Sequence, residues 1–383
     1  MSIFFIIIIL TLAGTTYYLA RRLYQGFACF FPKLKFLPIL GLVGALALIL
    51  ILGFGRSALP FSTETKQFLG LINSYSMGFF LYLLFYTVLL DLLMLVPRIL
   101  KLSVSQKPLV KGIMTICVLL LTSITCIFGF TQGTKIHPVS YEIALEGKKD
   151  ISDLKVVLIS DLHLGAVGSE ERLENIVDEI NAQKPDLICI AGDFFDTDFT
   201  SIQNPETAIQ TLKKLNATYG TYACLGNHDA GQTYPQMEAF LKEANITLLK
   251  ESYVVIDDRL VLIGRLDASP IGKFGEEKRQ ALSSFFTRKD VTLPVIVLDH
   301  NPAHIDEYSS EADLILCGHT HKGQVFPGSL LTDILYTVDY GHYQKDATSP
   351  HVIVTSGVGY WGMPMRVGTN CEIVSIHFTL SYD

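Results

Sequence analysis

Four long apolar segments near the start of the chain constrain its fold more than any other feature. They cover residues 3–20, 36–54, 68–96 and 112–130. Each is near or above the roughly 18 residues that an α-helix needs to cross a bilayer. The first lacks a basic start and a small-residue cleavage site, so a removable signal peptide is not expected. Residues 1–130 are therefore predicted to form four transmembrane helices.

Basic residues between these segments predict their orientation. Residues 1–130 hold ten Lys and Arg and two acids, a net charge of +8. Most of the basic residues follow the first and third segments: Arg21, Arg22, Lys33 and Lys35, then Arg98, Lys101, Lys107 and Lys111. The positive-inside rule places these two loops in the cytoplasm. With four spans, both termini then lie outside an inner (cytoplasmic) membrane.

One acid, Asp91, lies inside the third apolar segment. An ionisable residue within a span indicates a functional site by default. The alternatives are that Asp91 reaches the interface or is neutral among the helices. The sequence leaves these readings open.

The rest of the chain has a different character. The whole chain carries −7, so residues 131–383 carry −15. We interpret residues 131–150 as a linker, over 131–138, and an entry strand, and residues 151–383 as a folded domain. Apolar strands alternate there with helical patterns at 170–183, 208–215, 236–244 and 277–286, which predicts α/β sheets covered by helices. A net charge of −15 leaves little room for the basic groove that a nucleic-acid-binding domain needs, so nucleic acid is not an expected partner.

Five apolar strand-like runs of this domain are each followed by residues that can bind a metal. These are Asp161 and His163, Asp193 and Asp196, Asn227 and His228, His300, and finally His319 and His321. Ligands of α/β sheets gather at the carboxyl ends of strands, so these side chains are expected at one edge. His319 and His321 are two residues apart and therefore leave an extended chain on the same side.

The types of these residues indicate a dinuclear metal centre. Asp and Asn oxygens together with neutral imidazoles suit Mn, Fe or Zn, whereas an all-oxygen shell would suit Mg or Ca. Seven of these residues acting as ligands would be too many for one tetrahedral ion but would fit two ions that share a carboxylate. Two such ions can bind both the attacking and the leaving oxygen of a displacement at phosphorus.

The motifs D-L-H, G-D-F-F-D, G-N-H-D, H-N-P and G-H-T-H stand in this order in the chain. The series resembles the calcineurin-like metallophosphoesterase family over residues 153–378. The resemblance implies a four-layer α/β/β/α sandwich in which a metal-bound hydroxide attacks phosphorus. It assigns Asp161, His163 and His321 to the first ion, Asn227, His300 and His319 to the second, and Asp193 to both.

Two further residues receive roles from the same resemblance. His228 matches a histidine that is not a ligand and that stabilises or protonates the departing oxygen. Asp196 would orient this imidazole, or would only cap its loop. Protein Ser/Thr phosphatases of the family carry Arg where Thr197 and the residues after His228 stand here, so a dianionic phosphoprotein monoester is a less favoured substrate.

The segment 357–366 resembles the closing block of a bacterial, membrane-associated subgroup of the family. Gly357 and Gly359 would let this loop pass close to the site. Tyr360, Trp361 and Arg366 are candidates for binding the organic part of the substrate and its phosphate. Trp361 could equally pack the loop.

Together these features predict a membrane-anchored phosphoesterase whose catalytic domain lies outside the cytoplasm. Its substrate would contain a phosphodiester, a pyrophosphate or a lipid-linked phosphate, and its anchor would bind the lipid bilayer. The alternative is a catalytically silent, membrane-tethered binding module on the same fold. That alternative predicts a lost metal ligand, and the sequence retains all seven.

Overall fold

The computed structural model describes residues 3–56, 59–100, 107–145, 149–286, 292–309 and 311–379. The chain divides into two compact units, Met1–Phe130 and Thr131–Asp383. Lys101, which we assigned to a cytoplasmic loop, lies outside the described residues.

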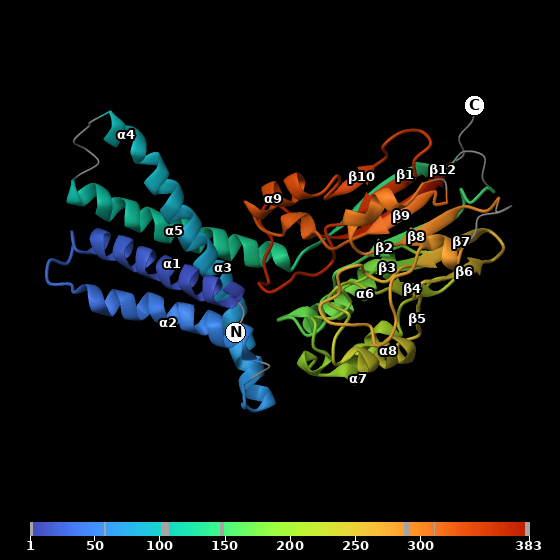
Figure 1. The fold of residues 1–383 in the computed structure, drawn as a ribbon, viewed down its shortest axis with the longest axis horizontal. Helices are drawn as coiled ribbons and strands as arrows, with labels where there is room; N and C mark the ends of the chain where they lie inside the picture. The colour runs from blue at the N-terminus through green and yellow to red at the C-terminus, as the bar shows by residue number, and fades with distance from the viewer. Residues whose placement is uncertain are drawn as a thin grey trace. The chain divides into compact units, whose positions relative to one another are not determined.

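The first unit is helical (Figure 1). Its helices are α1 (Ile3–Phe27), α2 (Phe36–Phe54), α3 (Thr63–Leu93), α4 (Leu95–Ile99) and α5 (Pro108–Gly133). Four stretches are long and apolar enough to cross a membrane: Ile6–Phe27, Phe36–Phe54, Thr63–Pro97 and Pro108–Gly133. The prediction of four apolar helices is confirmed. Helix α1 continues past its predicted segment to Phe27, α5 extends beyond its segment at both ends, and α3 begins and ends earlier than predicted.

Asp91 on α3 has two partners on α1. The Tyr18 hydroxyl donates a hydrogen bond of 2.7 Å to Asp91 Oδ2, and the same oxygen forms an ion pair of 2.6 Å with Arg22 Nη2. A charge within a membrane helix is stabilised by such internal pairing. Through these contacts Asp91 links helix α3 to helix α1.

The second unit contains two six-stranded sheets (Figure 1). The first has the order β1-β12-β2-β3-β4-β5. Its strands are β1 (Ile136–Ala144), β12 (Cys371–Thr379), β2 (Lys155–Ile159), β3 (Leu187–Ala191), β4 (Thr221–Cys224) and β5 (Ile246–Leu248). From β2 to β5 neighbouring strands are parallel, so their carboxyl ends meet at one edge.

The second sheet has the order β10-β11-β9-β8-β7-β6. Its strands are β10 (Gly341–Tyr343), β11 (His351–Val354), β9 (Leu314–Cys317), β8 (Val295–Leu298), β7 (Leu260–Gly264) and β6 (Ser252–Ile256). Here β11, β9, β8 and β7 are parallel to one another. This sheet also presents a row of strand carboxyl ends.

Alternating residues of the strands form the cores on either side of each sheet. In β2, Val157 and Ile159 pack against the helices α6 (Ser169–Ala182), α7 (Pro205–Leu212) and α8 (Tyr234–Glu243). Val156 and Leu158 point the other way, toward the second sheet. A third core lies on the outer face of the second sheet, beneath the 3₁₀ helices η4 (Leu282–Ser284) and η5 (Pro302–Glu307). The unit is the predicted four-layer sandwich.

The predicted helix over 277–286 is wrong. The described residues there hold only η4, because polar side chains bind the backbone that a helix would need. Arg265 Nη2 donates to the Gln280 carbonyl at 2.7 Å, and the Gln280 amide donates to Glu251 Oε2 at 2.9 Å. These hydrogen bonds replace a helical ladder with an extended segment.

The connection between the two units is shorter than predicted. Helix α5 ends at Gly133 and strand β1 begins at Ile136, so two residues separate them. Residues 131–138, which we interpreted as a linker, belong mostly to these two elements. Strand β1 pairs with β12 in parallel over its whole length, from Ile136 to Ala144.

Candidate active site

Every metal-ligand candidate of the sequence lies just after a strand of one of the two sheets. Asp161, Asp193 and Asn227 follow β2, β3 and β4 of the first sheet. His300 follows β8 of the second sheet, and His319 and His321 follow β9. His163 stands two residues beyond Asp161. The structure brings these side chains into two neighbouring groups.

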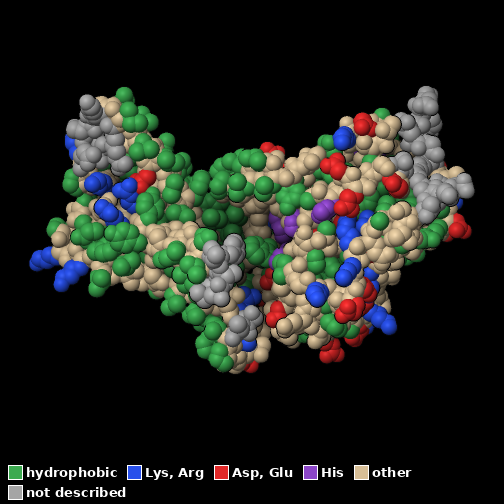
Figure 2. All heavy atoms as spheres, viewed as in Figure 1, with side chains coloured by type: hydrophobic (Ala, Val, Ile, Leu, Met, Phe, Trp, Pro, Cys, Tyr) green, Lys and Arg blue, Asp and Glu red, His purple; other side chains and the backbone are tan. Residues whose placement is uncertain are grey.

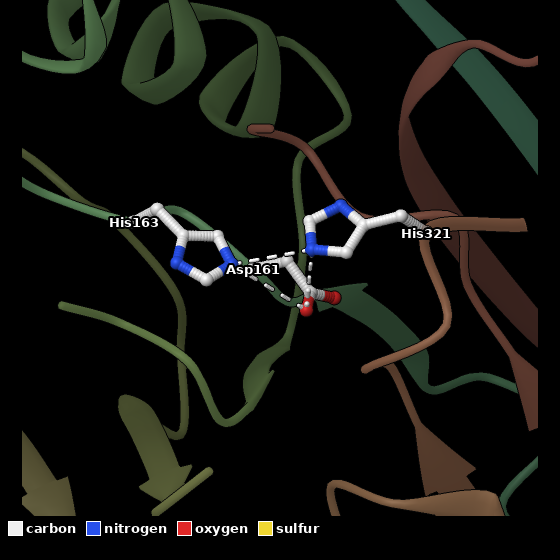
Figure 3. A group of neighbouring side chains, drawn as sticks. All are labelled: Asp161, His163 and His321. Atoms are coloured by element: carbon white, nitrogen blue, oxygen red, sulfur yellow. Dashed lines mark hydrogen bonds and ion pairs between the residues drawn. The ribbon is translucent and has the colours of Figure 1, made fainter. Parts of the chain in front are cut away.

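The first group consists of Asp161, His163 and His321, which are all buried (Figure 3). One ligand atom from each residue lies within 4.8 Å of the others. The two imidazoles face one another with 3.2 Å between their Nε2 atoms, and His321 Nε2 is 3.3 Å from Asp161 Oδ1. Converging nitrogen and oxygen lone pairs of this kind fit a divalent cation.

The second group consists of Asp193, His300 and His319. His300 Nε2 lies 3.1 Å from Asp193 Oδ2 and 3.3 Å from His319 Nδ1. Asn227 joins this group through Oδ1, which is 2.8 Å from His319 Nδ1. His300 Nδ1 donates to the Ala191 carbonyl at 2.7 Å, which directs Nε2 into the group.

Asp193 lies between the two groups. Its Oδ2 atom is 3.1 Å from His300 Nε2 in one group and 3.8 Å from His163 Nε2 in the other. Its Oδ1 atom accepts a hydrogen bond of 2.8 Å from the His228 amide. A carboxylate in this place can face two cations at once. The clustered His and Asp residues are compatible with a dinuclear divalent metal site.

Burial sets the protonation of the histidines. It lowers the pKa of His163 and of His319 to about 3, so both imidazoles are neutral near pH 7 and keep a lone pair for a metal. Burial would also lower the pKa of His300, but the Asp193 carboxylate raises it well above its usual value. A cation bound beside Asp193 would take the place of that proton.

The backbone at the site is unusual. Five candidate ligands have left-handed φ angles: Asp161 (56°), His163 (48°), Asp193 (50°), His319 (71°) and His321 (49°). Such residues are uncommon outside glycine and concentrate at functional sites. At Gly357 the loop 357–366 passes so close that a Cβ atom would lie 2.7 Å from the Asp161 Cβ. The sequence prediction of a close approach at Gly357 agrees with this geometry.

His228 lies beside the first group, with its ring centroid 5.0 Å from that of His163. Its Nδ1 forms a hydrogen bond of 2.6 Å with Thr197 Oγ1. Asp196, to which the resemblance gave the orienting role, lies near both rings: its carboxylate, a nitrogen of His163 and a nitrogen of His228 lie within 4.8 Å of one another, and Asp196 Oδ1 is 3.7 Å from His163 Nδ1. Thr197 was noticed in the sequence only as a departure from the phosphatase pattern, and no signal there indicated its contact.

Two of the three substrate-binding candidates are buried in structural contacts. Arg366 is fully buried and donates to the backbone carbonyls of His321, Ser356 and Gly359. The Tyr360 hydroxyl donates to the Val167 carbonyl at 2.8 Å. These contacts contradict a role in binding substrate for Arg366 and Tyr360.

The third candidate, Trp361, is 42% exposed, and its ring centroid lies 6.0 Å from that of His228. Its backbone amide donates to Gln324 Oε1 at 2.8 Å, which holds this part of the loop beside the site. Trp361 therefore remains a candidate for contacting substrate.

We predict that Arg366→Met lowers the free energy of unfolding by roughly 3 kcal/mol or more, since buried carbonyl oxygens lose their donors. The measurement is a denaturant titration of the full chain in detergent micelles. Arg259→Met is the control, because Arg259 pairs with the exposed Asp153 and its loss should change stability far less. Equal effects of the two substitutions would contradict the structural role of Arg366.

Comparisons with known proteins agree with this site. The family model for calcineurin-like phosphoesterases matches residues 154–323. An uncharacterized metallophosphoesterase of Aquifex aeolicus is 31% identical over 241 residues, which cover 62% of this chain and 89% of that protein. The chain belongs to the calcineurin-like metallophosphoesterase family.

Two other relatives extend the comparison. An uncharacterized metallophosphoesterase of Helicobacter pylori is 31% identical over 64% of this chain, and the match spans 65% of that relative's length. A transmembrane protein with metallophosphoesterase domain from Danio rerio is 28% identical over 340 residues, 82% of this chain and 75% of that one. Together with the four apolar helices, this likeness identifies a membrane protein.

Proposed function

We propose that the protein is a membrane-anchored phosphoesterase with two divalent cations, Mn, Fe or Zn, that hydrolyses a phosphodiester, a pyrophosphate or a lipid-linked phosphate. The observation that carries this proposal is the Asp193 carboxylate between two groups of buried ligand atoms. Asp161, His163 and His321 would hold one cation, and Asn227, His300 and His319 the other. Bound cations would activate water and neutralise charge on the phosphoryl oxygens.

The chain's own residues would supply the remaining steps. His228 is half-buried beside the first group, and its Nδ1 atom shares a hydrogen bond with the Thr197 hydroxyl. The other ring nitrogen, Nε2, is therefore available to the departing oxygen. A group in this position can give that oxygen a proton as the bond to phosphorus breaks. Trp361 would cover this side of the site and limit the access of water.

The basic residues around the site favour a diester over a monoester. Arg366 binds backbone carbonyls, Arg172 Nη2 donates to the Val358 carbonyl at 2.9 Å, and Lys322 Nζ lies 3.9 Å from the centroid of the Tyr340 ring. Each head group therefore has a partner within the protein. A dianionic monoester would gain more from a free guanidinium than a monoanionic diester, so the diester fits this site better.

The charges of the membrane half support an extracytoplasmic position for the catalytic domain. Basic residues follow the first and third spans, and these loops would face the cytoplasm. The chain after the fourth span, α5, would then emerge on the outer side of an inner membrane. Protease added to right-side-out vesicles should cleave the second unit, whereas inverted vesicles should protect it.

The test of function is metal-dependent hydrolysis of bis-p-nitrophenyl phosphate and p-nitrophenyl phosphate by the full chain in detergent. We expect hydrolysis with added manganese, its loss with a chelator, and a preference for the diester of about tenfold in kcat/KM. A preference for the monoester would contradict the argument from the paired basic residues.

One outcome would favour the catalytically silent binding module. The protein would bind two metals per chain yet hydrolyse neither ester at a rate above that of Asp193→Asn. This result would leave the metal site in place and remove the proposed reaction.

A further inference from the structure

Large apolar side chains of the second unit are exposed on and beside helix α9 (Gly328–Leu335). We call Phe326, Leu330, Leu331, Ile334 and Leu335 the α9 surface. Ile334 is 80% exposed and Leu335 is 75% exposed, and no residue of α9 is buried. A soluble domain rarely leaves so many large apolar side chains together in water. The α9 surface therefore requires a partner.

Helix α9 is fixed directly beside the metal-ligand candidates. The 3₁₀ helix η6 (His321–Gly323) precedes it, and a Cβ atom at Gly323 would lie 2.2 Å from the Ser329 amide nitrogen. After the helix, the Tyr336 ring centroid lies 6.2 Å from that of His319. The Thr332 hydroxyl donates to Asp339 Oδ2, and the Thr320 hydroxyl donates to the Asp339 carbonyl, each at 2.6 Å. The exposed face of α9 therefore borders the site.

Trp361 adds an exposed aromatic ring near the same edge. Gln324, two residues before Phe326, donates from Nε2 to the Trp361 and Met363 carbonyls at 2.9 and 3.1 Å. The Trp361 ring in turn lies close to His228. Figure 2 shows histidine side chains, in purple, reaching the surface of the molecule. Indole rings are favoured at the boundary between lipid and water.

The loop that carries Trp361 also contacts the point where the chain leaves its last membrane helix. Gly133 ends α5, and a Cβ atom there would lie 2.8 Å from the Pro364 carbonyl oxygen and 3.1 Å from the Met365 Cα. The Cys371 thiol is 3.6 Å from the Gly133 carbonyl oxygen. Gly133 and the loop 357–366 both belong to the second unit, so the loop packs against the residues through which the chain enters that unit.

We propose that the α9 surface and Trp361 dock into the outer lipid–water interface and that the site acts on a phosphate ester carried by a lipid. The choice of substrate rests on the proposed function, whereas the docking does not. A lipid interface accepts apolar side chains without specific contacts, and Asp333 is the only charged residue of α9. The second unit is tethered to the bilayer by the chain itself, because only two residues separate the end of the fourth span, α5, from β1.

A second copy of the chain is a less suitable partner. A stable protein interface buries about 800 Å² on each side, and the side chains of an eight-residue helix offer less. The overall charge of −15 for residues 131–383 would also repel a second copy. A neutral bilayer surface carries no such penalty.

The test uses Trp361, which is the only tryptophan of the chain. The full chain is reconstituted in phosphatidylcholine vesicles whose acyl chains carry bromine near the headgroup, and in matched vesicles without bromine. We expect bromine to quench the Trp361 fluorescence by about half, as at an interfacial depth. The double variant Ile334→Glu/Leu335→Glu should lose most of this quenching.

The matched control is Tyr253→Glu/Val255→Glu on β6, where the side chains are 49% and 43% exposed. This control should be quenched as strongly as the unaltered protein. Absence of quenching in the unaltered protein, or equal quenching in the α9 variant, would overturn the docking. A fluorescence change that follows the ratio of protein to lipid rather than bromine would assign the α9 surface to a second copy and would also overturn it.

A turnover measurement tests the substrate separately. In the α9 variant, the rate on a fluorescent lipid phosphodiester in vesicles, divided by the rate on bis-p-nitrophenyl phosphate, should fall about tenfold. An unchanged ratio would overturn the lipid-borne substrate. If the unaltered protein is quenched by brominated lipid but hydrolyses neither ester, the docking stands and the proposed function fails.

Discussion

Asp193→Asn is expected to lower kcat/KM for bis-p-nitrophenyl phosphate by about 10³-fold or more and to reduce the bound metal below two ions per chain. Asp193 is buried, and its Oδ2 atom faces His300 at 3.1 Å and His163 at 3.8 Å. Asparagine has nearly the same shape but no charge, so it would keep the packing and remove the shared ligand. Turnover and metal content of the purified full chain measure the two effects.

The matched control for this variant is Asp258→Asn in the β6–β7 turn, which removes one exposed carboxylate before the amino end of β7, opposite the sheet edge where β8 and β9 carry the candidate ligands. Its turnover and metal content should equal those of the unaltered protein. Full activity of Asp193→Asn would contradict the shared-ligand role. Loss of activity with both ions retained would show that Asp193 acts on the reaction and is not needed for binding.

His228→Asn is expected to lower kcat by about 10²–10³-fold while two metal ions remain bound, because the imidazole is assigned to the departing oxygen. The defect should be largest for an alkyl leaving group and much smaller for p-nitrophenolate, which needs little protonation. The measurement compares kcat for a p-nitrophenyl alkyl diester and for a dialkyl diester. An equal loss on both substrates, or loss of metal, would contradict this role.

Thr197→Val tests how His228 is held. The substitution removes the hydrogen bond of 2.6 Å at His228 Nδ1 and keeps the size of the side chain. We expect kcat to fall about fivefold to tenfold and the acidic or basic limb of its pH profile to move, since a positioning residue acts through the imidazole. A lower kcat with an unchanged pH profile would indicate only a change of packing.

The parts of the molecule that depend on local pattern could be predicted from the sequence. Apolar runs of membrane length became helices, and the strand ends after β2, β3, β4, β8 and β9 carry the candidate ligands. Both predictions follow from regularities of a few consecutive residues. No long-range contact had to be known.

Two of the errors concern side chains whose partners are distant in the chain. The segment 277–286 has a helical pattern, but Arg265 and Glu251 bind its backbone. Arg366 could equally have bound a substrate phosphate, and only the fold shows that three carbonyls surround its guanidinium. Helix α9 was missed because its exposed face is apolar, contrary to the pattern of a helix on a soluble domain.

The left-handed backbone at five candidate ligands has a consequence for the thermodynamics of the whole second unit. A non-glycine residue in such a conformation costs of order 1–3 kcal/mol, so folding works against the ligand geometry. Cations that bind only the folded chain would offset this cost. The free energy of unfolding would then rise with the logarithm of the free metal concentration. Metal supply would then govern how much folded protein persists as well as how fast it works. A destabilising substitution far from the site should be masked in metal-rich medium and exposed by metal starvation.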